Sequence, residues 1–470
     1  MKKVILSLAA LSLILGATSC NNKNNDDDTV VTPTPTGPEE LTGDISADRT
    51  LSADKKYLLK GFVYVTNGAT LTIPAGTVIM GDKATKGTLV VTRGSKINAT
   101  GTSDKPVIFT SGLAAGARRE GDWGGIIILG KAPVNATGGE AKIEGGLVAT
   151  GGGDEKNYIY YGGTNAADNS GTLKYVRIEF AGIAYSPDNE INGLTLGGVG
   201  NGTTISYVQV YRSGDDGFEW FGGTVNCDHL VSTYSWDDDF DTDNGYSGNV
   251  QFGLIQRYKT IADQSGSNAF ESDNDANGST NSPKTTAKFA NVTVLGPVLT
   301  TGTSGIDASY QHAAQIRRNS SISIYNSILA GFPFGLYIDD TKGSKTIENV
   351  KAGTIGFMGN IIAGCNTPWK AEALATADST AYKTWRTASA TTVLTSAADI
   401  QLVDPNKFSA AVGTTTGTPN FLLQATSPAA AGAVSVSAYG LSNTTYRGAF
   451  DGATDWTKGW TTWAAESTAY

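Results

Sequence analysis

Carboxylates recur around a short aromatic phrase that the middle of the chain repeats. The phrase occurs at 214–220, 237–243 and 267–273, and each copy holds a phenylalanine. If these rings point into a core, strand alternation sends the acidic residue after each ring to the outer face. Carboxylates on neighbouring strands would lie about 5 Å apart, so they need protons, a cation or a basic partner. The rings are Phe218, Phe240 and Phe270, and the acidic residues after them are Glu219, Asp241 and Glu271.

Other oxygen-bearing side chains flank this column and favour calcium, which takes its ligands from oxygen atoms. The segment 273–278 has the D-x-D-x-N-G opening of a calcium loop, although Lys284 stands where an EF-hand has its closing Glu. The acidic pairs at 215–216 and 237–238 lie just before the column. A solvated acidic face is the alternative that the same residues allow. The predicted calcium ligands are Asp239, Asp241, Asp243, Glu271, Asp273, Asp275 and Asn277.

Aromatic residues cluster around the same acidic segments. Rings can stack on the C–H faces of sugars while nearby carboxylates accept hydrogen bonds from sugar hydroxyls. We therefore predict a surface for a glycan or a protein partner on Glu219, Trp220, Trp236 and Tyr246. The alternative is that several of these rings fill the core or pack loops.

Paired aspartates also suit the cleavage of polysaccharides. In such an enzyme Asp215, Asp216 and Asp241 would be catalytic, and Arg317 or Arg318 could serve as the base of a calcium-assisted lyase. The chain has no His-Gly pair, and its Asp-Thr-Asp phrase follows the aspartate pair instead of preceding it. We therefore predict a non-catalytic binding or structural module, with a polysaccharide lyase or glycoside hydrolase as the alternative.

The histidines and the later cysteines indicate no further site. His229 and His312 have no nucleophile or cluster of metal ligands beside them in the sequence, so we expect ordinary hydrogen-bonded histidines. Cys227 and Cys365 form either a disulfide or two buried apolar positions, and the sequence leaves both open.

The fold follows from an internal repeat. Apolar strand cores begin at 174, 206, 228, 249, 289, 324 and 357, so the shortest spacings are 22 and 21 residues (228 − 206 and 249 − 228). These spacings are too short for the units of a β-propeller, which take about 40–50 residues. They suit the rungs of a solenoid, in which the longer spacings carry loop insertions. We predict an all-β, right-handed parallel β-helix over residues 42–465.

Three stretches depart from the repeat. Residues 112–170 are rich in glycine and predict one or two rungs with a long loop. Residues 368–390 are rich in alanine and predict a short helical excursion. The tail from Tyr446 onward is dense in aromatic residues. Because an open end of a β-helix exposes backbone and core, we expect this tail to cap one end.

Several phrases resemble a group of bacterial surface lipoproteins with the pectin-lyase-like fold. Examples are LTIPAGTVIMG at 71–81, GDWGGIIILGKAPVN at 121–135, SGDDGFEWFGGTVN at 213–226 and YRGAFDGATDW at 446–456. The resemblance spans about residues 42–460 and implies a right-handed parallel β-helix on an exported protein. It implies no activity, because the same fold carries pectate lyases, polygalacturonases and proteins without known catalysis.

The N-terminus predicts export and lipid attachment. Lys2 and Lys3 precede an apolar stretch at 4–16, which is too short to span a bilayer. The small residues before Cys20 resemble a lipobox, so we predict a signal peptide at 1–19 and lipidation of Cys20. An ordinary signal peptide with an incidental cysteine is the alternative.

The segment after Cys20 predicts a disordered tether over residues 20–41. It lacks apolar periodicity and alternates Thr with Pro. The acidic run at 26–28 is similar to surface-export signals, although a solvated linker explains it equally well. The formal charge of −9 argues against nucleic acid as a partner. We predict an outer-membrane lipoprotein on the cell surface, or on the periplasmic face, that contacts the membrane through its lipid alone.

Overall fold

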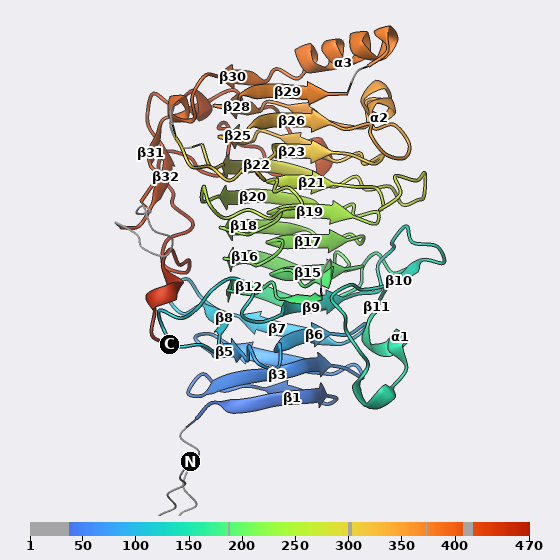
Figure 1. Ribbon diagram of the computed structural model, residues 1–470, viewed down its shortest axis with the longest axis vertical. Coiled ribbons are helices and arrows are strands. Elements are labelled where there is room, and N and C mark those ends of the chain that lie inside the picture. The colour runs from blue at the N-terminus through green and yellow to red at the C-terminus, as the bar shows by residue number, and fades with distance from the viewer. Residues whose placement is uncertain (1–36, 187–188, 299–302, 373, 408–416) are drawn as a thin grey trace, which may run out of the picture. The chain divides into compact units, whose positions relative to one another are not determined.

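The dominant feature of the structure is one sheet of 26 strands, wound so that successive turns of the chain pair in parallel (Figure 1). The structure is a computed structural model that describes residues 37–186, 189–298, 303–372, 374–407 and 417–470. Pro38–Tyr470 forms one compact unit. The first strand begins at Glu39, while the predicted signal peptide and Cys20 lie outside the described residues.

One ladder of parallel strands runs the whole length of the solenoid and carries the acidic phrases. Each of its strands pairs with the next from the first rung to the last, with one register shift in the first pair, at Thr42–Gly43 (Figure 1). Its strands are β1 (Glu39–Ile45), β3 (Lys56–Val65), β6 (Thr88–Val91), β9 (Gly125–Leu129), β15 (Leu194–Gly197), β17 (Phe218–Phe221), β19 (Phe240–Asp243), β21 (Phe270–Ser272), β23 (His312–Ile316), β26 (Phe334–Ile338) and β29 (Thr367–Ala371).

The remaining solenoid strands form the other faces. In each of β12, β16, β18, β20 and β22 a single strand bends and so covers two faces of the solenoid. One residue with positive φ makes the corner in each strand, such as Tyr207 at 55° or His229 at 53°. These strands are β2 (Arg49–Thr50), β4 (Thr70–Pro74), β5 (Val78–Gly81), β7 (Lys96–Thr100), β8 (Val107–Ser111), β12 (Gly171–Glu179), β16 (Thr204–Tyr211), β18 (Cys227–Thr233), β20 (Asn249–Gln256), β22 (Lys288–Leu295), β24 (Ser323–Tyr325), β25 (Ile328–Ala330), β27 (Phe357–Met358), β28 (Ile361–Ala363) and β30 (Thr392–Leu394).

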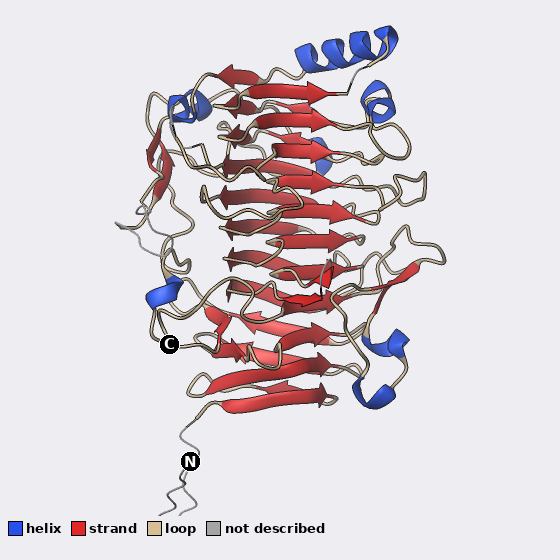
Figure 2. Ribbon diagram, in the orientation of Figure 1, coloured by secondary structure: helices blue, strands red, loops and turns tan. Residues whose placement is uncertain are grey.

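Short elements outside the stack belong to insertions and to the tail (Figure 2). They include three antiparallel strand pairs, three α-helices and several 3₁₀ turns. The pairs are β10 (Glu140–Lys142) with β11 (Tyr160–Gly162), β13 (Ala184–Ser186) with β14 (Asn189–Glu190), and β31 (Leu402–Asp404) with β32 (Asn420–Leu423). The helices are α1 (Glu155–Tyr158), α2 (Ile347–Lys351) and α3 (Thr376–Ala388), and the 3₁₀ turns are at Thr150–Gly152, Ala397–Ile400, Pro428–Ala430, Ser437–Tyr439 and Ala465–Ser467.

The predicted phenylalanine ladder lies inside the solenoid. Phe218, Phe240 and Phe270 are in register on β17, β19 and β21, and all three are fully buried. Each neighbouring pair of rings makes an edge-to-face contact with centroids 5.6 Å apart. The predicted parallel β-helix is thus confirmed, because this register places equivalent residues of successive rungs directly above one another.

The aromatic tail does not cap an end of the solenoid, so that prediction is wrong. The chain from Ala397 onward runs back beside the rungs, and the C-terminus lies near the early ones (Figure 1). Phe421, Phe450 and Trp460 pack on an outward-facing apolar column that includes Leu254 and Ile328. The tail covers apolar groups on this side, among them Val231, Leu254, Ile328 and Ile361, that would otherwise face water.

The predicted helical excursion closes the last rung instead. Tyr382 and Trp385 of α3 pack against the core, and Trp385 contacts Phe357 and Trp369. Figure 1 shows α3 lying across the end of the stack beyond β29. Alanine-rich character suits this role, since an amphipathic helix covers exposed core atoms while satisfying its own backbone groups.

Cys227 and Cys365 are free thiols, so of the two alternatives the disulfide is excluded. Burial raises the pKa of the Cys227 thiol to about 12, which keeps it protonated and unreactive in the core.

Within the described part of the chain, no helix has both the length and the apolar character needed to cross a bilayer.

Substituting the central ring tests the ladder. Phe240→Ala should lower the free energy of unfolding by about 3–5 kcal/mol, because it leaves a cavity between two rings that cannot close over it. Val393→Ala, at a side chain that is 48% exposed, is the control and should change stability by less than about 0.5 kcal/mol. Urea unfolding followed by circular dichroism measures both, and equal losses would contradict the stacked core.

Candidate functional site

One column of outward-facing side chains changes character along the solenoid, and its middle is acidic. In register from the first rung, the column begins with Asp44, Tyr64, Val90, Ile127 and Thr195. It continues with Glu219, Asp241, Glu271, Gln315, Tyr337 and Lys370. The predicted stacking of Glu219, Asp241 and Glu271 is therefore what the strand register produces.

The acidic turns before β17 and β19 add carboxylates to this column. Three groups each bring oxygen atoms within 4.8 Å of one another. Because Asp216 and Asp241 each belong to two groups, the groups join into one continuous cluster, here called the acidic site. The groups are Asp215 with Asp216 and Asp237, Asp216 with Glu219 and Asp241, and Asp238 with Asp241 and Glu271.

Backbone hydrogen bonds between rungs fix these turns. The peptide N–H of Asp238 donates to the Asp216 carboxylate at 2.7 Å, and that of Asn268 donates to the Asp238 carboxylate at 2.5 Å. Each of these three residues lies two positions before a core phenylalanine. The repeat thus uses one side-chain acceptor per rung to bind the next turn, which holds the carboxylates at fixed spacing.

Among the described residues, ion pairs with positive side chains form at one end of the acidic site. Arg317 forms ion pairs with Glu271 and, at 2.9 Å, with Asp273, and Arg318 pairs with Asp273 at 2.6 Å. Among the described residues, no Lys, Arg or His forms an ion pair with the other six carboxylates. These six are Asp215, Asp216, Glu219, Asp237, Asp238 and Asp241.

Three oxygen atoms in and beside the acidic site are buried without a hydrogen-bond partner. They are Oδ1 of Asp237, Oδ1 of Asp241 and Oδ1 of Asn192. Asn192 is 1% exposed, and its amide nitrogen donates to Glu219. Buried polar atoms are rarely left unpaired in native proteins, so three in one place make this part of the solenoid a candidate binding site.

Burial and mutual repulsion favour the protonated form of these carboxyl groups. Burial raises the pKa of Asp237 to about 6 and that of Glu271 to about 7, although Arg317 opposes the shift at Glu271. Burial and the nearby Asp273 raise the pKa of Asp243 to about 8. Burial together with neighbouring carboxylates holds the pKa values of five groups well above their usual range: Asp215, Asp216, Glu219, Asp238 and Asp241.

Several predicted calcium ligands lie outside the acidic site. Asp239 is fully buried and binds Arg257 at 3.1 Å and the Ser232 hydroxyl at 2.6 Å, so it balances a buried guanidinium. Asp275 accepts the backbone N–H groups of Asn277 and Ser279 and shapes a turn. The structure therefore does not bring the carboxylates of Asp239 and Asp275 into the acidic site, and the Asn277 side chain is exposed.

The prediction that Trp220 and Tyr246 belong to a ligand-binding surface is wrong. Trp220 and Tyr246 are fully buried, and their rings stack with centroids 5.4 Å apart. The physical reason is strand alternation: Trp220 stands two residues after Phe218 and so shares its inward direction. Trp236, in contrast, is 41% exposed and directly precedes Asp237. Glu219 takes the predicted outward position with 7% of its surface exposed.

Sequence inspection missed two residues of the acidic site that come from distant segments. Asn192 lies just before β15, and Glu144 lies in the insertion that follows β9. The Asn192 amide donates to both Glu219 and Glu144, the latter at 3.4 Å. No pattern in the sequence marks these two residues, because only the docking of the insertion on the rungs brings them to Glu219.

The histidines have structural roles, as predicted. His229 stacks between Tyr207 and Phe252, with ring centroids 4.2 and 4.9 Å away. His312 is 2% exposed, and burial lowers its pKa to about 3, which keeps the ring neutral. Its Nδ1 bonds to the Asn268 side chain at 2.9 Å.

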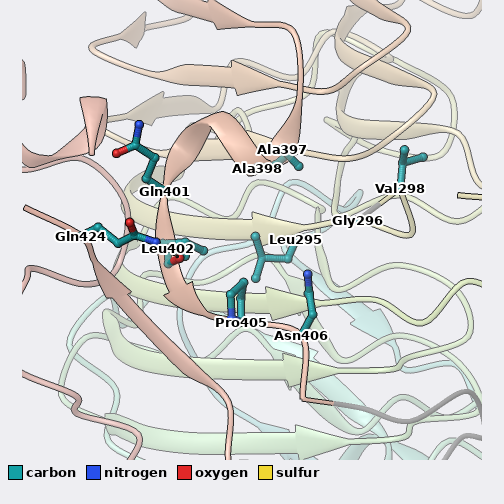
Figure 3. A pocket seen from close by; sticks show the side chains of 11 residues that line it. Leu295, Gly296, Val298, Ala397, Ala398, Gln401, Leu402, Pro405, Asn406 and Gln424 are labelled. Carbon is teal, nitrogen blue, oxygen red and sulfur yellow. Dashed lines mark hydrogen bonds between the residues drawn. The ribbon is translucent and has the colours of Figure 1, made fainter. Parts of the chain in front are cut away.

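An apolar cavity lies away from the acidic site, between the solenoid and the returning tail (Figure 3). It has a volume of about 270 Å³, and its walls include Leu295, Val298, Leu402 and Pro405. Gln401 and Gln424 lie at its rim in Figure 3. The cavity contains no charged side chain among its lining residues, so it shares no chemistry with the acidic site.

Comparison with known proteins identifies the family. The model of the pectate-lyase-like β-helix domain matches residues 43–402, which is most of the chain. The chain belongs to this family. No curated protein and no solved structure shows a significant match to it. Membership agrees with the observed solenoid, and it leaves open whether this β-helix binds or cleaves its ligand.

The raised pKa values predict an unusual pH dependence of stability for the chelator-treated protein. A carboxyl group with a raised pKa binds its proton more tightly when folded. The stability that such a group contributes is fully present below its pKa in the unfolded chain, which is about 4. This stability is lost as the pH rises through the pKa of the group in the folded protein. With Asp237 near 6, Glu271 near 7 and Asp243 near 8, the thermal midpoint should fall between about pH 5 and pH 8.5.

Calorimetry in a chelating buffer measures this dependence. Asp241→Asn, which removes one of the repelling charges, should make the fall shallower, while Asp54→Asn at an exposed position should leave it unchanged. A midpoint that rises with pH across this range would contradict the crowding of carboxylates.

Proposed function

We propose that this protein is a cell-envelope binding module that holds a glycan at the acidic site with the help of Ca²⁺. The observation that carries the proposal is the set of buried, unpartnered oxygens on Asp237, Asp241 and Asn192 within a cluster of carboxylates. Carboxylate and amide oxygens are the ligands that Ca²⁺ takes in proteins, usually six to eight of them.

A divalent cation would resolve the electrostatic conflict at the acidic site. Six of its carboxylates have no ion pair among the described residues, and their pKa values show that they resist ionisation together. A bound cation reverses this preference, because an opposite charge within about 4–6 Å favours the ionised form. Protonation would also remove the repulsion between the carboxylates, but protonated carboxyl groups would no longer serve as ligands for the cation.

The exposed ring of Trp236 supports a sugar ligand. It lies next to Asp237, and its backbone oxygen accepts hydrogen bonds from Arg257 at 3.1 Å and from the Ser267 hydroxyl at 2.6 Å. These bonds fix the backbone that presents the ring. An exposed ring beside carboxylates offers a stacking face and hydroxyl acceptors together, which neutral and acidic sugars both use.

A calcium-assisted lyase or hydrolase is the second candidate, and the position of Arg317 favours it. This guanidinium contacts Glu271 at one end of the acidic site, so a positive group lies beside the carboxylates that would hold the cation, although its ion pairs with Glu271 and Asp273 raise its pKa further. Asp215 and Asp216 lie in the same site with carboxylate oxygens within 4.8 Å of one another, which is close to the separation of about 5–5.5 Å between the two carboxyl groups of retaining glycosidases.

Calcium should raise the thermal midpoint of the full chain relative to the same protein in chelator. Binding to the folded state alone stabilises it by about 2.7 kcal/mol when the ion is at one hundred times its Kd. Asp241→Asn should remove most of the rise, since this residue belongs to two of the three groups, and Asp54→Asn should keep it. Equal midpoints with and without Ca²⁺ would exclude the cation.

Glycan binding and turnover distinguish the module from the enzyme. Trp236→Ala should weaken Ca²⁺-dependent glycan binding by about 1 kcal/mol, roughly fivefold, while Tyr439→Ala, an exposed aromatic on the tail, should not. Product analysis by mass spectrometry should find intact glycan. Shortened products that disappear in the Asp215→Asn, Asp216→Asn variant would establish the enzyme.

Envelope attachment is the part of the proposal that rests on the N-terminal sequence. Lipidation of Cys20 after removal of residues 1–19 would place the β-helix at the outer membrane, with the tether as spacer. A labelled fatty acid should enter the protein in bacterial cells, and Cys20→Ala should abolish the label. Label retained in the Cys20→Ala protein would refute attachment at this residue.

A further inference from the structure

A polar groove, separate from the acidic site, lies between the first rungs and the insertion that carries α1. It has a volume of about 570 Å³. Two hydrogen bonds join its walls: the Tyr158 hydroxyl donates to Asp44 at 2.6 Å, and the Arg93 guanidinium donates to the backbone oxygen of Lys156 at 2.9 Å. None of the residues of the acidic site lines this groove.

Three cationic side chains belong to the groove. Arg93, Lys131 and Lys156 line it, and one carboxylate, Glu140, pairs with Arg93 at 2.5 Å and with Lys156 at 3.1 Å. Among the described residues Lys131 has no ion pair, and its side chain is exposed. Three cations against the carboxylates of Glu140 and the lining Asp44 leave the groove with a small excess of positive charge, on a chain whose formal charge is −9.

Gly94 leaves room for the ammonium group of Lys131. It has a φ of +88°, and a Cβ at this position would lie 2.6 Å from Nζ of Lys131. A side chain at position 94 would therefore make the flexible lysine side chain shift. Lys131 is also anchored from behind, because its backbone N–H donates to Asp168 at 3.0 Å.

The guanidinium of Arg93 is held in one orientation before any ligand binds. Besides Glu140 and Lys156, it donates to the backbone oxygen of Gly162 at 3.2 Å, and its side chain is only 16% exposed. Such preorganisation lowers the entropic cost of binding an oxyanion.

The groove also presents groups that bind hydroxyls. Asp44 is exposed and receives the Tyr158 hydroxyl through one oxygen, and the exposed amides of Asn67 and Asn157 lie along the same groove. The Tyr158 ring is fixed by an edge-to-face contact with Tyr64, with centroids 5.0 Å apart. A ligand that fits this groove carries both an oxyanion and hydroxyl groups.

We propose that this groove binds an acidic carbohydrate independently of the acidic site. A carboxylate or sulfate group on the sugar lies against Arg93 and Lys131, and ring hydroxyls donate to Asp44 and bond to the two amides. The chemistry common to both ligand types is an oxyanion on a polyhydroxylated ring.

The test uses the full chain in chelator, so that Ca²⁺ plays no part. Isothermal calorimetry compares a short uronate oligosaccharide, a sulfated oligosaccharide and the neutral oligosaccharide of the same length. We expect at least one acidic probe to bind, the neutral one to bind far more weakly, and Lys131→Gln to weaken binding about tenfold, the effect of losing one charge-assisted hydrogen bond. Which acidic probe binds distinguishes carboxylate from sulfate.

Lys142→Gln is the matched control, since it removes the same charge from the same insertion at a lysine that pairs with Glu155 outside the groove. Equal loss in both variants would show a general charge effect and overturn the proposal. So would unchanged binding by Lys131→Gln, binding of the neutral probe as tight as that of the acidic ones, no binding of either acidic probe, or inorganic sulfate binding as tightly as the sugars.

Discussion

Register between neighbouring rungs is the constraint on which the rest of this structure depends. Parallel strands place equivalent residues about 4.8 Å apart, so each rung repeats the chemistry of the one before it. Inside the solenoid this stacks Phe218, Phe240 and Phe270 edge to face, which is favourable. Outside, the same register stacks Glu219, Asp241 and Glu271, which is unfavourable without a partner. One geometric rule therefore produces both the core and the acidic site.

The outer surface of the solenoid shows what happens to each kind of column. Where outward side chains are apolar, another part of the chain covers them. The insertion after β9 packs on Tyr64, Val90 and Ile127, and the tail packs on the column that includes Leu254 and Ile328. No described segment neutralises the middle of the acidic column. The protein thus covers both of these apolar columns but leaves the acidic site without a neutralising segment among the described residues, which directs attention to the acidic site as a place of binding.

The two candidate sites have opposite charge and share one short segment. Glu140 pairs with Arg93 and Lys156 at the groove, and Glu144, four residues later, meets Asn192 at the acidic site. The insertion thus supplies a carboxylate to each site while its apolar side chains cover the column between them. Movement of this segment would alter both places, since its position decides how much of the positive charge of the groove is neutralised and whether Glu144 reaches the carboxylates.

The sequence by itself determined the solenoid, the inward phenylalanines and the outward acidic column, because period-two alternation and a rung spacing of 21–22 residues are local properties. The same rule, applied to Trp220, would also have placed that ring in the core. Only the tertiary structure decided the rest. The tail lies along the side because an apolar outer column competes for it more strongly than an open end does, and α3 takes the end instead. Asp239 faces Arg257, and Asn192 and Glu144 join Glu219, through contacts between residues 18 to 75 positions apart (257 − 239 and 219 − 144). No local pattern encodes such pairings, since they depend on which insertions dock on which rungs.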